Sequence, residues 1–305
     1  MSATPELSVV IPSWNTKDYL AACLESLAAA EKPPTEVIVV ENGSADGSAE
    51  LVAERHPEVH LVRNAVNEGF ARGSNQGMRL ARGRYVLLLN TDTVLFRDSI
   101  AELVRFLDEH PDYAAVAPRL VHADGRTQRT VQEFPNLWTA LFFATPLERW
   151  FPRSPELERY FMRSWDQESS RDVDQPPAAC LLLRKSVLDQ VGLFDEELWL
   201  FYNDVDLSQR ILAAGWKTRY LAEARVVHHV GGSTRKYEDF VSTYAKDRLR
   251  YYRKHHGRFG GAWLKGCVCL AFVDWVARQW SAKLRGKPHE PVPPTWRKFL
   301  TFLRL

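Results

Sequence analysis

Short apolar runs alternate with longer amphipathic segments through the first 120 residues, and this alternation constrains the fold more than any other feature. Each run is continuously apolar rather than alternating with a period of two, which is typical of strands covered on both faces. Strands that alternate with helices of this length predict an α/β fold with a mostly parallel sheet and helices on both faces. We expect strands at 7–12, 36–40, 59–63, 85–89 and 114–117, and helices at 18–30, 48–56, 73–82 and 98–108.

The alternation of predicted strands and helices stops at residue 122 and resumes near residue 179. Residues 122–177 mix aromatic side chains with prolines and charges, a composition that indicates a binding loop or lid. A strand at 179–183, a helix at 206–214 and an extended segment at 220–229 follow. We therefore expect one α/β domain with halves at 1–120 and 121–245, and a separate tail at 246–305.

Polar residues follow four of the predicted strands at the point where each strand ends. Ligands of open parallel sheets bind beyond the carboxyl ends of the strands, so these residues are candidates for a binding site. Any one of the segments could be an ordinary turn, but four together predict a ligand. The segments are Ser13–Asn15, Glu41–Ser48, Asn64–Asn75 and Asn90–Asp92.

Asp92 and His228 are candidate metal ligands. Asp92 follows a buried strand, where a carboxylate suits Mg²⁺ or Mn²⁺ that bridges phosphate oxygens, although a turn aspartate is the common alternative. His228 and His229 end an extended segment, so one side chain points inward and the other outward. An inward histidine is either a hydrogen-bonded core residue or a second metal ligand.

Asp204 is a candidate general base. It lies in the segment Asn203–Asp206, which opens a predicted helix, and asparagine and aspartate are preferred as helix N-caps. Residues two apart on a helix do not share a face, so capping explains one of the two carboxylates better than both. Asp204 could then accept a proton from a substrate hydroxyl. The helix N-terminus favours the anion, which predicts a weakened base.

The other strand-end segments suit a nucleotide. Glu41 and Asp46 could accept hydrogen bonds from a base or ribose, or could form a simple Asx turn. Residues 67–77 offer backbone N–H groups, amides and Arg72 to phosphates. This segment lacks both the Walker and the GxGxxG spacing, which argues against a P-loop NTPase or an NAD-dependent dehydrogenase.

Seven motifs in order make the chain resemble the inverting nucleotide-sugar glycosyltransferases of family 2, with the GT-A fold, and especially their rhamnosyltransferase-like branch. They span roughly residues 7–233, about three quarters of the chain. The motifs are Val-Val-Ile-Pro-Ser-Trp-Asn15, Val-Val-Glu-Asn-Gly-Ser-Ala-Asp-Gly-Ser48, Asn67-Glu-Gly-Phe-Ala-Arg-Gly-Ser-Asn75, Gly83-Arg-Tyr-Val-Leu-Leu-Leu-Asn-Thr-Asp92, Gly192-Leu-Phe-Asp-Glu196, Asn203-Asp-Val-Asp-Leu207 and Val227-His-His-Val-Gly-Gly-Ser233.

The resemblance implies a role for each site residue. Asp92 and His228 would bind Mg²⁺ or Mn²⁺, Asp204 would deprotonate the acceptor hydroxyl, and Asn203 and Asp206 would position the acceptor. The nucleotide-sugar pocket would comprise Pro12, Trp14, Asn15, Glu41, Asn42, Asp46, Asn67, Gly69, Phe70, Arg72, Asn75, Asn90 and Thr91.

Three positions depart from the family pattern. Glu41 stands where aspartate is usual, Asn90 replaces the first aspartate of the DxD motif, and Asn203 stands where glutamate usually precedes the base. The resemblance implies transfer of a sugar from a nucleoside-diphosphate donor, with dTDP-rhamnose, UDP-sugars and GDP-sugars as candidates. The acceptor would be a saccharide or a lipid-linked saccharide in cell-surface polysaccharide synthesis. Asn203 leaves a catalytically weak nucleotide-sugar-binding module as the alternative.

Positive charge is concentrated at the C-terminal end. The whole chain has a formal charge of +2, but residues 246–305 hold 14 Lys and Arg against three acidic residues, a net +11, together with ten aromatics. Leu264, Val268, Phe272 and Trp275 share a helical face, and such a basic amphipathic stretch suits an anionic membrane surface. Packing on the body or in a homodimer is the alternative. The tail contains no recognised nucleic-acid module, so we expect no nucleic-acid partner.

The sequence also predicts a location. The four cysteines have no metal-type or disulfide spacing, and the N-terminus has no basic region before its first apolar run. No stretch reaches the roughly 18–20 apolar residues that a spanning helix needs. We therefore expect a cytoplasmic protein that binds the inner face of the cell membrane peripherally.

Overall fold

The computed structural model describes residues 4–229, 231, 239–286, 288 and 292–305. Val230, Gly232 and Ser233 of the last motif lie outside this set. The chain forms two compact units: Met1–Gln132 with Trp165–Glu238, and Glu133–Ser164 with Asp239–Leu305. The unit boundaries thus fall at residues 132, 164 and 238, where the sequence led us to place divisions at 120 and 245.

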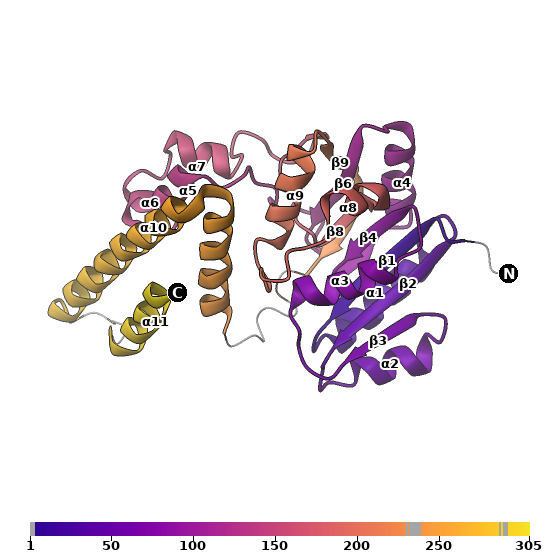
Figure 1. Ribbon diagram of the computed structural model, residues 1–305, viewed down its shortest axis with the longest axis horizontal. Helices are drawn as coiled ribbons and strands as arrows, with labels where there is room; N and C mark the ends of the chain where they lie inside the picture. Colours follow the sequence, from indigo (N-terminus) through magenta and orange to yellow (C-terminus); the bar gives the residue numbers. More distant parts are fainter. Residues whose placement is uncertain (1–3, 230, 232–238, 287, 289–291) are drawn as a thin grey trace. The chain divides into compact units, whose positions relative to one another are not determined.

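The first half of the sheet is the parallel α/β arrangement that the sequence predicts. Strands β1 to β4 stand in the order β3-β2-β1-β4, and every neighbouring pair is parallel (Figure 1). Their bounds are β1 Leu7–Ser13, β2 Thr35–Asn42, β3 His60–Asn64 and β4 Tyr85–Leu89. The helices that connect and follow them are α1 Lys17–Ala29, α2 Ser48–Arg55, α3 Phe70–Leu80 and α4 Ser99–Glu109.

The second half of the sheet is mixed. The order continues β4-β8-β6-β9-β5, and β7 pairs with β9 at Arg219 and Tyr220. Strand β8 runs antiparallel to both β4 and β6, β6 and β9 are parallel, and β5 and β7 are antiparallel to β9. The α/β class is confirmed. The bounds are β5 Thr93–Leu95, β6 Tyr113–Val121, β7 Arg171–Asp172, β8 Cys180–Arg184 and β9 Lys217–His228.

Helices cover both faces of the sheet and bury its central strands β1, β4 and β8 almost completely. Val9 and Ile11 of β1 face α1 and α4, and Val10 between them faces the layer that contains α3, α8 (Lys185–Val191) and α9 (Asn203–Ala213). All three valine and isoleucine side chains are fully buried, each contributing about 1.5–3 kcal/mol. Burial on both faces explains why the strands are continuously apolar.

The second unit contains three short helices where the sequence suggested an irregular loop: α5 Leu137–Phe142, α6 Pro146–Trp150 and α7 Pro155–Tyr160. It also contains α10 Phe240–Leu284 and α11 Val292–Arg304, which confirm that the basic tail is helical. Thr145 and Ser154 cap α6 and α7, and a proline occupies the first turn of each helix. Proline is favoured at that position because the missing N–H has no partner there. Two of the prolines that indicated a loop, Pro146 and Pro155, therefore mark helix starts.

Helix α10 bends at Gly257, whose φ of 64° and ψ of −166° interrupt the helix. It contains an 18-residue window of mean hydropathy 1.3, of which 28% is buried. By length and composition alone this helix could cross a membrane, so our expectation that no segment is long and apolar enough was wrong. Between Arg258 and Arg278 only Lys265 and Asp274 are charged, which makes the window apolar on average.

Candidate active site

A cavity of about 240 Å³ opens in the first unit, beside the carboxyl ends of β1 and β4. Segments from both halves of the sequence form its wall. The residues that line it are Pro12, Phe70, Asn90, Thr91, Asp92, Pro177, Ala178, Ala179, Leu200, Phe201, Asn203, Asp204 and His228. The cavity thus brings eight of the residues predicted from the sequence into one place, including all three candidates for metal binding and base catalysis.

Strand pairing brings Asp92 and His228 together. In the antiparallel ladder between β5 and β9, Thr93 lies opposite His228, and the carbonyl of Asp92 accepts a 2.7 Å hydrogen bond from the His229 N–H. Alternate residues of β9 up to Val226 are buried, and His228 continues this face. The His228 Nε2 atom lies 3.5 Å from the Asp92 Oδ1 atom, and both side chains are largely buried.

This pair fits a divalent cation whose remaining ligands come from substrate. Mg²⁺ is commonly bound through one or two carboxylates plus phosphate oxygens and water, and imidazole is a further ligand for Mn²⁺. Among the described residues, no three His, Cys, Asp or Glu side chains cluster as a self-sufficient metal site. Asp92 and His228 would therefore hold the ion only in part, leaving positions for a diphosphate.

Asp204 lies in the first turn of α9, half-buried in the cavity wall. Its carboxylate accepts hydrogen bonds from the Val205 N–H at 2.9 Å and the Ala178 N–H at 3.3 Å. Burial raises the pKa of Asp204 above its ordinary value, and these two hydrogen bonds offset the effect only in part. The position at a helix N-terminus predicted a lowered pKa and a weakened base, but desolvation raises the pKa instead.

The neighbours of Asp204 have different surroundings. The Asn203 amide lines the same cavity and donates a 2.9 Å hydrogen bond to the Leu200 carbonyl. The Asp206 carboxylate is fully buried and accepts a 2.9 Å hydrogen bond from Arg210 Nε. Arg210 in turn donates to the main-chain carbonyl of Leu193 at 2.7 Å. Asp206 therefore connects α9 to the loop that follows α8.

The turns after β1 and β2 are joined by hydrogen bonds. The Asn15 side chain accepts from the Ala45 N–H at 2.9 Å, and the Glu41 carboxylate accepts from the Ser44 N–H at 2.9 Å within its own turn. Asp46 accepts from the Lys17 N–H at 2.8 Å and from Ser48. Burial acts to raise the pKa of Asp46, but the hydrogen bonds from Ser48 and Lys17 outweigh it and lower the pKa.

Asparagine side chains connect β2 to the start of α3. The Asn42 amide donates to Asn67 Oδ1 at 3.0 Å and to the Gly69 carbonyl at 3.1 Å, and its oxygen accepts from the Glu68 N–H at 3.0 Å. Asn75 is buried further along α3 and pairs through both amide atoms with the main chain of Phe194. These side chains shape the loop rather than leaving their amides free.

The remaining predicted residues do not line the cavity. The exposed Arg72 guanidinium pairs with Glu68 at 2.8 Å, and Trp14 lies half-buried between Ser13 and Asn15. Sequence reasoning missed Pro177–Ala179, Leu200 and Phe201 in the wall, although an apolar run directly before the Asn203 motif is a signal that could have found the last two. It also missed Gln128, whose Oε1 atom lies 3.0 Å from His228 Nδ1 and which belongs to no motif.

Residues 8–191 match the model of the family described as glycosyl transferase family 2. A Mycobacterium tuberculosis protein named N-acetylglucosaminyl-diphospho-decaprenol L-rhamnosyltransferase is 30% identical over 242 residues, which cover 76% of this chain and 78% of that protein. The O-antigen biosynthesis protein RfbC of Myxococcus xanthus is 27% identical over 76% of this chain, but this match covers only 18% of RfbC.

The fold is also that of a solved glycosyltransferase. The mannosyltransferase PcManGT from Pyrobaculum calidifontis, in complex with GDP-Man and Mn²⁺, superposes with a TM-score of 0.57 at 18% identity. The superposition covers 99% of this chain and 86% of PcManGT. The family match extends over more than half of the chain and includes the turns and the Asp92 segment described above. The chain belongs to glycosyltransferase family 2.

Proposed function

We propose that this protein is an inverting glycosyltransferase that moves L-rhamnose from dTDP-rhamnose to a hydroxyl of a lipid-linked saccharide during cell-surface polysaccharide synthesis. One observation carries the proposal: Asp92, His228 and Asp204 line a single cavity at the carboxyl edge of the sheet. A metal-binding pair and a carboxylate of raised pKa in one cavity are what the reaction requires.

Two relatives support the choice of substrates. The Mycobacterium tuberculosis relative is named for L-rhamnose transfer to a diphospho-decaprenol-linked N-acetylglucosamine, and RfbC is named for O-antigen synthesis. The related structure of PcManGT holds a nucleoside-diphosphate sugar and Mn²⁺. UDP- and GDP-sugars remain candidate donors, since the PcManGT structure holds GDP-Man.

The reaction needs a base on one side of the sugar and a leaving group on the other. Asp204 accepts the proton of the acceptor hydroxyl, and that oxygen attacks the anomeric carbon as the bond to the nucleoside diphosphate breaks. Attack opposite the leaving group inverts the configuration. Asp92 and His228 would hold Mg²⁺ or Mn²⁺, which would supply positive charge to the departing diphosphate. The raised pKa of Asp204 makes its carboxylate a better proton acceptor.

The second unit suits the surface of an anionic membrane. Among the described residues, it carries 12 of the 16 exposed large apolar side chains, although it accounts for only about a third of the chain. Trp150, Phe259 and Trp280 are each at least 60% exposed. Aromatic and basic residues together favour the membrane interface, so we place the protein on the inner face of the cell membrane. A homodimer contact through this unit is the alternative.

The decisive test is a donor screen with the purified protein. Nucleotide release from dTDP-, UDP- and GDP-sugars would be measured with Mg²⁺ or Mn²⁺ and an N-acetylglucosaminyl-diphospho-lipid acceptor. We expect dTDP-rhamnose to be turned over, and Asp204→Asn to lower kcat by about 10²–10⁴ while leaving donor binding intact. Asp98→Asn, an exposed carboxylate at the start of α4, is the matched control.

A catalytically weak nucleotide-sugar-binding module is the second candidate, and Asn203 beside the base motivates it. It predicts that wild type and Asp204→Asn bind a nucleotide sugar equally well and release nucleotide at the same background rate. That result would rule out the enzyme and leave the binding function.

A further inference from the structure

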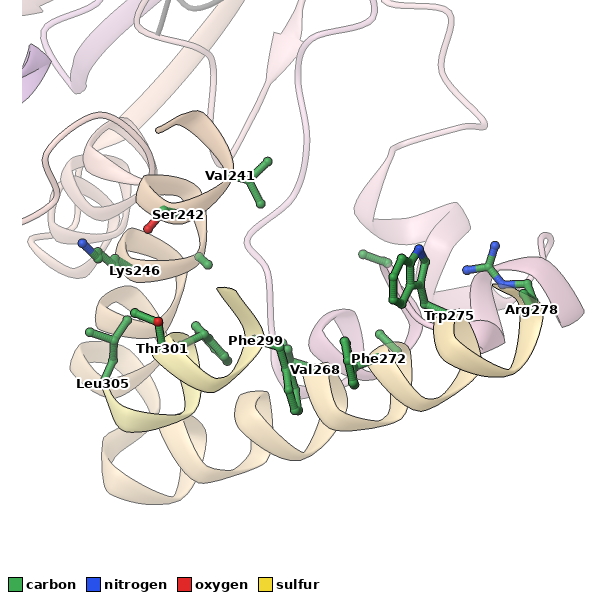
Figure 2. Close-up of a pocket in the computed structure, with 14 residues that line it drawn as sticks. Val241, Ser242, Lys246, Val268, Phe272, Trp275, Arg278, Phe299, Thr301 and Leu305 are labelled. Atoms are coloured by element: carbon green, nitrogen blue, oxygen red, sulfur yellow. The ribbon is translucent and has the colours of Figure 1, made fainter. Parts of the chain in front are cut away.

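The second unit contains an apolar groove between α10 and α11. Its volume is about 400 Å³, within the range of about 300–1,000 Å³ that small-molecule sites occupy. Figure 2 shows Val268, Phe272 and Trp275 along the part of α10 that follows the bend at Gly257, with Phe299 of α11 beside them. Lys246 and Arg278 stand at opposite ends of this row. Most of the residues that line the groove are apolar.

Specific contacts hold the walls of the groove. The rings of Phe272 and Phe299 stack with centroids 4.1 Å apart, and Lys265 Nζ donates a 2.8 Å hydrogen bond to the Leu303 carbonyl at the end of α11. Arg253 donates similarly to the Leu305 carbonyl at 2.8 Å. Cations at a helix C-terminus also interact favourably with its dipole. The groove therefore lies between α10 and α11, which are joined by a ring contact and by hydrogen bonds.

We propose that this groove binds the isoprenoid chain of a lipid-linked acceptor; the inference rests on the proposed function and adds a second substrate-binding site to it. A hydrocarbon chain has no polar groups, so an apolar lining loses nothing by contacting it, and each buried CH₂ contributes about 0.8 kcal/mol. The exposed Lys246 ammonium can pair with the diphosphate that heads the chain. Arg278 Nε already donates a 2.9 Å hydrogen bond to the Asp274 carboxylate, so Lys246 is the residue that binds the diphosphate head group.

Two other occupants fit the groove less well. A second copy of this chain would bury about 800 Å² on each partner, which a groove of this volume does not by itself provide. A phospholipid has two acyl chains, whereas the groove has a volume of about 400 Å³, and Lys246 and Arg278 are among its lining residues. A single hydrocarbon chain with a strongly anionic head matches both this volume and this charge.

The test fills the groove without adding charge. Ala271→Trp places an indole in the lining, and Val273→Trp places the same side chain at a position of the same helix that is 65% exposed. Binding of geranylgeranyl diphosphate to the full-length protein would be measured by calorimetry. We expect Ala271→Trp to weaken binding of geranylgeranyl diphosphate at least tenfold and Val273→Trp to leave it unchanged. Lys246→Ala should weaken binding of the diphosphate but not binding of geranylgeraniol, which lacks the diphosphate.

Transfer assays separate the two proposals. Ala271→Trp should raise KM for an N-acetylglucosaminyl-diphospho-lipid with a 20-carbon chain, and leave KM for a propyl analogue unchanged. If no acceptor is glycosylated but Ala271→Trp still loses the lipid, the proposed function fails and the groove assignment stands. Unchanged lipid binding in Ala271→Trp overturns the assignment. Displacement by a monomeric phospholipid at equal affinity, or loss of a dimer in Ala271→Trp, overturns it as well.

A separate observation concerns Gln128 in the first unit, whose side chain is 3% exposed. Its amide nitrogen donates to the His228 carbonyl at 2.6 Å and to the Val121 carbonyl at 3.3 Å. These two acceptors fix the orientation of the amide, so the oxygen faces His228 Nδ1 at 3.0 Å. A carbonyl oxygen can only accept, and Nδ1 must therefore carry the proton. In the neutral ring the lone pair then lies on Nε2, the nitrogen that faces Asp92.

We infer that Gln128 is a positioning residue that holds His228 in the tautomer required for metal binding through Nε2; this too rests on the proposed function. Groups that hydrogen-bond the second nitrogen of a ligating histidine set its tautomer and ring orientation. Removing such a group typically weakens metal binding by about 10–100-fold. Here the same amide also ties the His228 main chain to β6, so both the ring and its backbone are fixed.

The test compares Gln128→Leu with Gln128→Glu. Glutamate can still accept the Nδ1 proton but loses the N–H donors to the His228 and Val121 carbonyls, so we expect it to lose less Mn²⁺ affinity than leucine, which loses about 10–100-fold in an EPR titration with Mn²⁺ alone. Nitrogen NMR of labelled histidine, assigned by the signal lost in His228→Ala, should show the Nδ1–H tautomer in wild type and its loss in Gln128→Leu. Gln190→Leu, on the exposed surface, is the control.

Neither measurement depends on sugar transfer, so a failure of the proposed function would be seen separately. Wild-type Mn²⁺ affinity in Gln128→Leu, or an Nε2–H tautomer in the wild-type protein, overturns the role of Gln128. A purely structural role would lower stability in Gln128→Leu without changing the tautomer.

Discussion

The carboxylate of Asp204 is subject to two opposing physical effects. Its place in the first turn of α9 favours the anion, as do the hydrogen bonds from Val205 and Ala178. Burial in the cavity wall disfavours the anion and dominates, so the pKa is raised. Sequence spacing identified the residue but gave the wrong sign for its basicity, because burial is a property of the surrounding chain.

This balance predicts the pH dependence of the reaction. A base must be ionised to act, so activity should fall as the pH drops through the raised pKa of Asp204, and the acid limb of kcat should lie above the ordinary aspartate value of about 3.9. The measurement is kcat against pH at saturating donor and metal. Asp204→Asn should lose the acid limb together with most of the rate. An acid limb of the same midpoint in the residual activity of Asp204→Asn would assign it to another group, with His228 and Asp92 the titratable candidates in the cavity.

At the scale of elements, the start of α3 depends on a glycine. Gly69 precedes the helix with φ of 91° and ψ of 164°, a conformation that is essentially restricted to glycine. A Cβ there would lie 2.5 Å from the Trp199 indole nitrogen, so the close approach of this tryptophan also requires glycine. The sequence motif contains Gly69, but only the structure shows that Trp199, 130 positions later, packs on it.

We therefore expect Gly69→Ala to destabilise the protein by about 2–4 kcal/mol, from backbone strain and the contact with Trp199 together. Gly125→Ala is the matched control, since Gly125 also has a positive φ of 84° but no atom within 4 Å of an added Cβ. It should cost about 1 kcal/mol. Urea denaturation followed by circular dichroism measures both, and equal losses would show that the Trp199 contact contributes nothing.

At the scale of the whole molecule, charge and exposed apolar side chains are concentrated in the same part of the chain. Lys283 and Arg285 are exposed near the end of α10, beside the exposed Trp280 and Leu284. Each basic residue near an anionic surface contributes about 1 kcal/mol to membrane binding. The net charge of +2 conceals this separation because the rest of the chain is acidic.

Neutralising these two residues should weaken membrane binding. Lys283→Ala/Arg285→Ala is expected to lower affinity for phosphatidylglycerol vesicles at low salt by about 10- to 30-fold, as measured by co-sedimentation. The control is Arg55→Ala/Arg97→Ala, which removes the same charge from exposed positions of the first unit. If both double variants lose affinity equally, net charge rather than this surface drives binding.

The sequence by itself determined the α/β class and predicted three polar residues that line one cavity in the structure. Continuous apolar runs specify strands buried on both faces, and Asp92, Asp204 and His228 each lie in a motif of fixed spacing. These features are local, so they can be read along the chain. Pro146 and Pro155 suggested a loop rather than helices because proline suits both a loop and a helix start.

Only the tertiary structure decided how distant residues act on one another. The pairing of β5 with β9 brings His228 to Asp92, Gln128 orients the imidazole from 100 positions away, and burial rather than helix position sets the pKa of Asp204. The groove between α10 and α11 likewise depends on the bend at Gly257 and on the stacking of Phe272 with Phe299. Residue types follow from sequence, but desolvation, tautomer and groove shape depend on contacts between segments that no local pattern encodes.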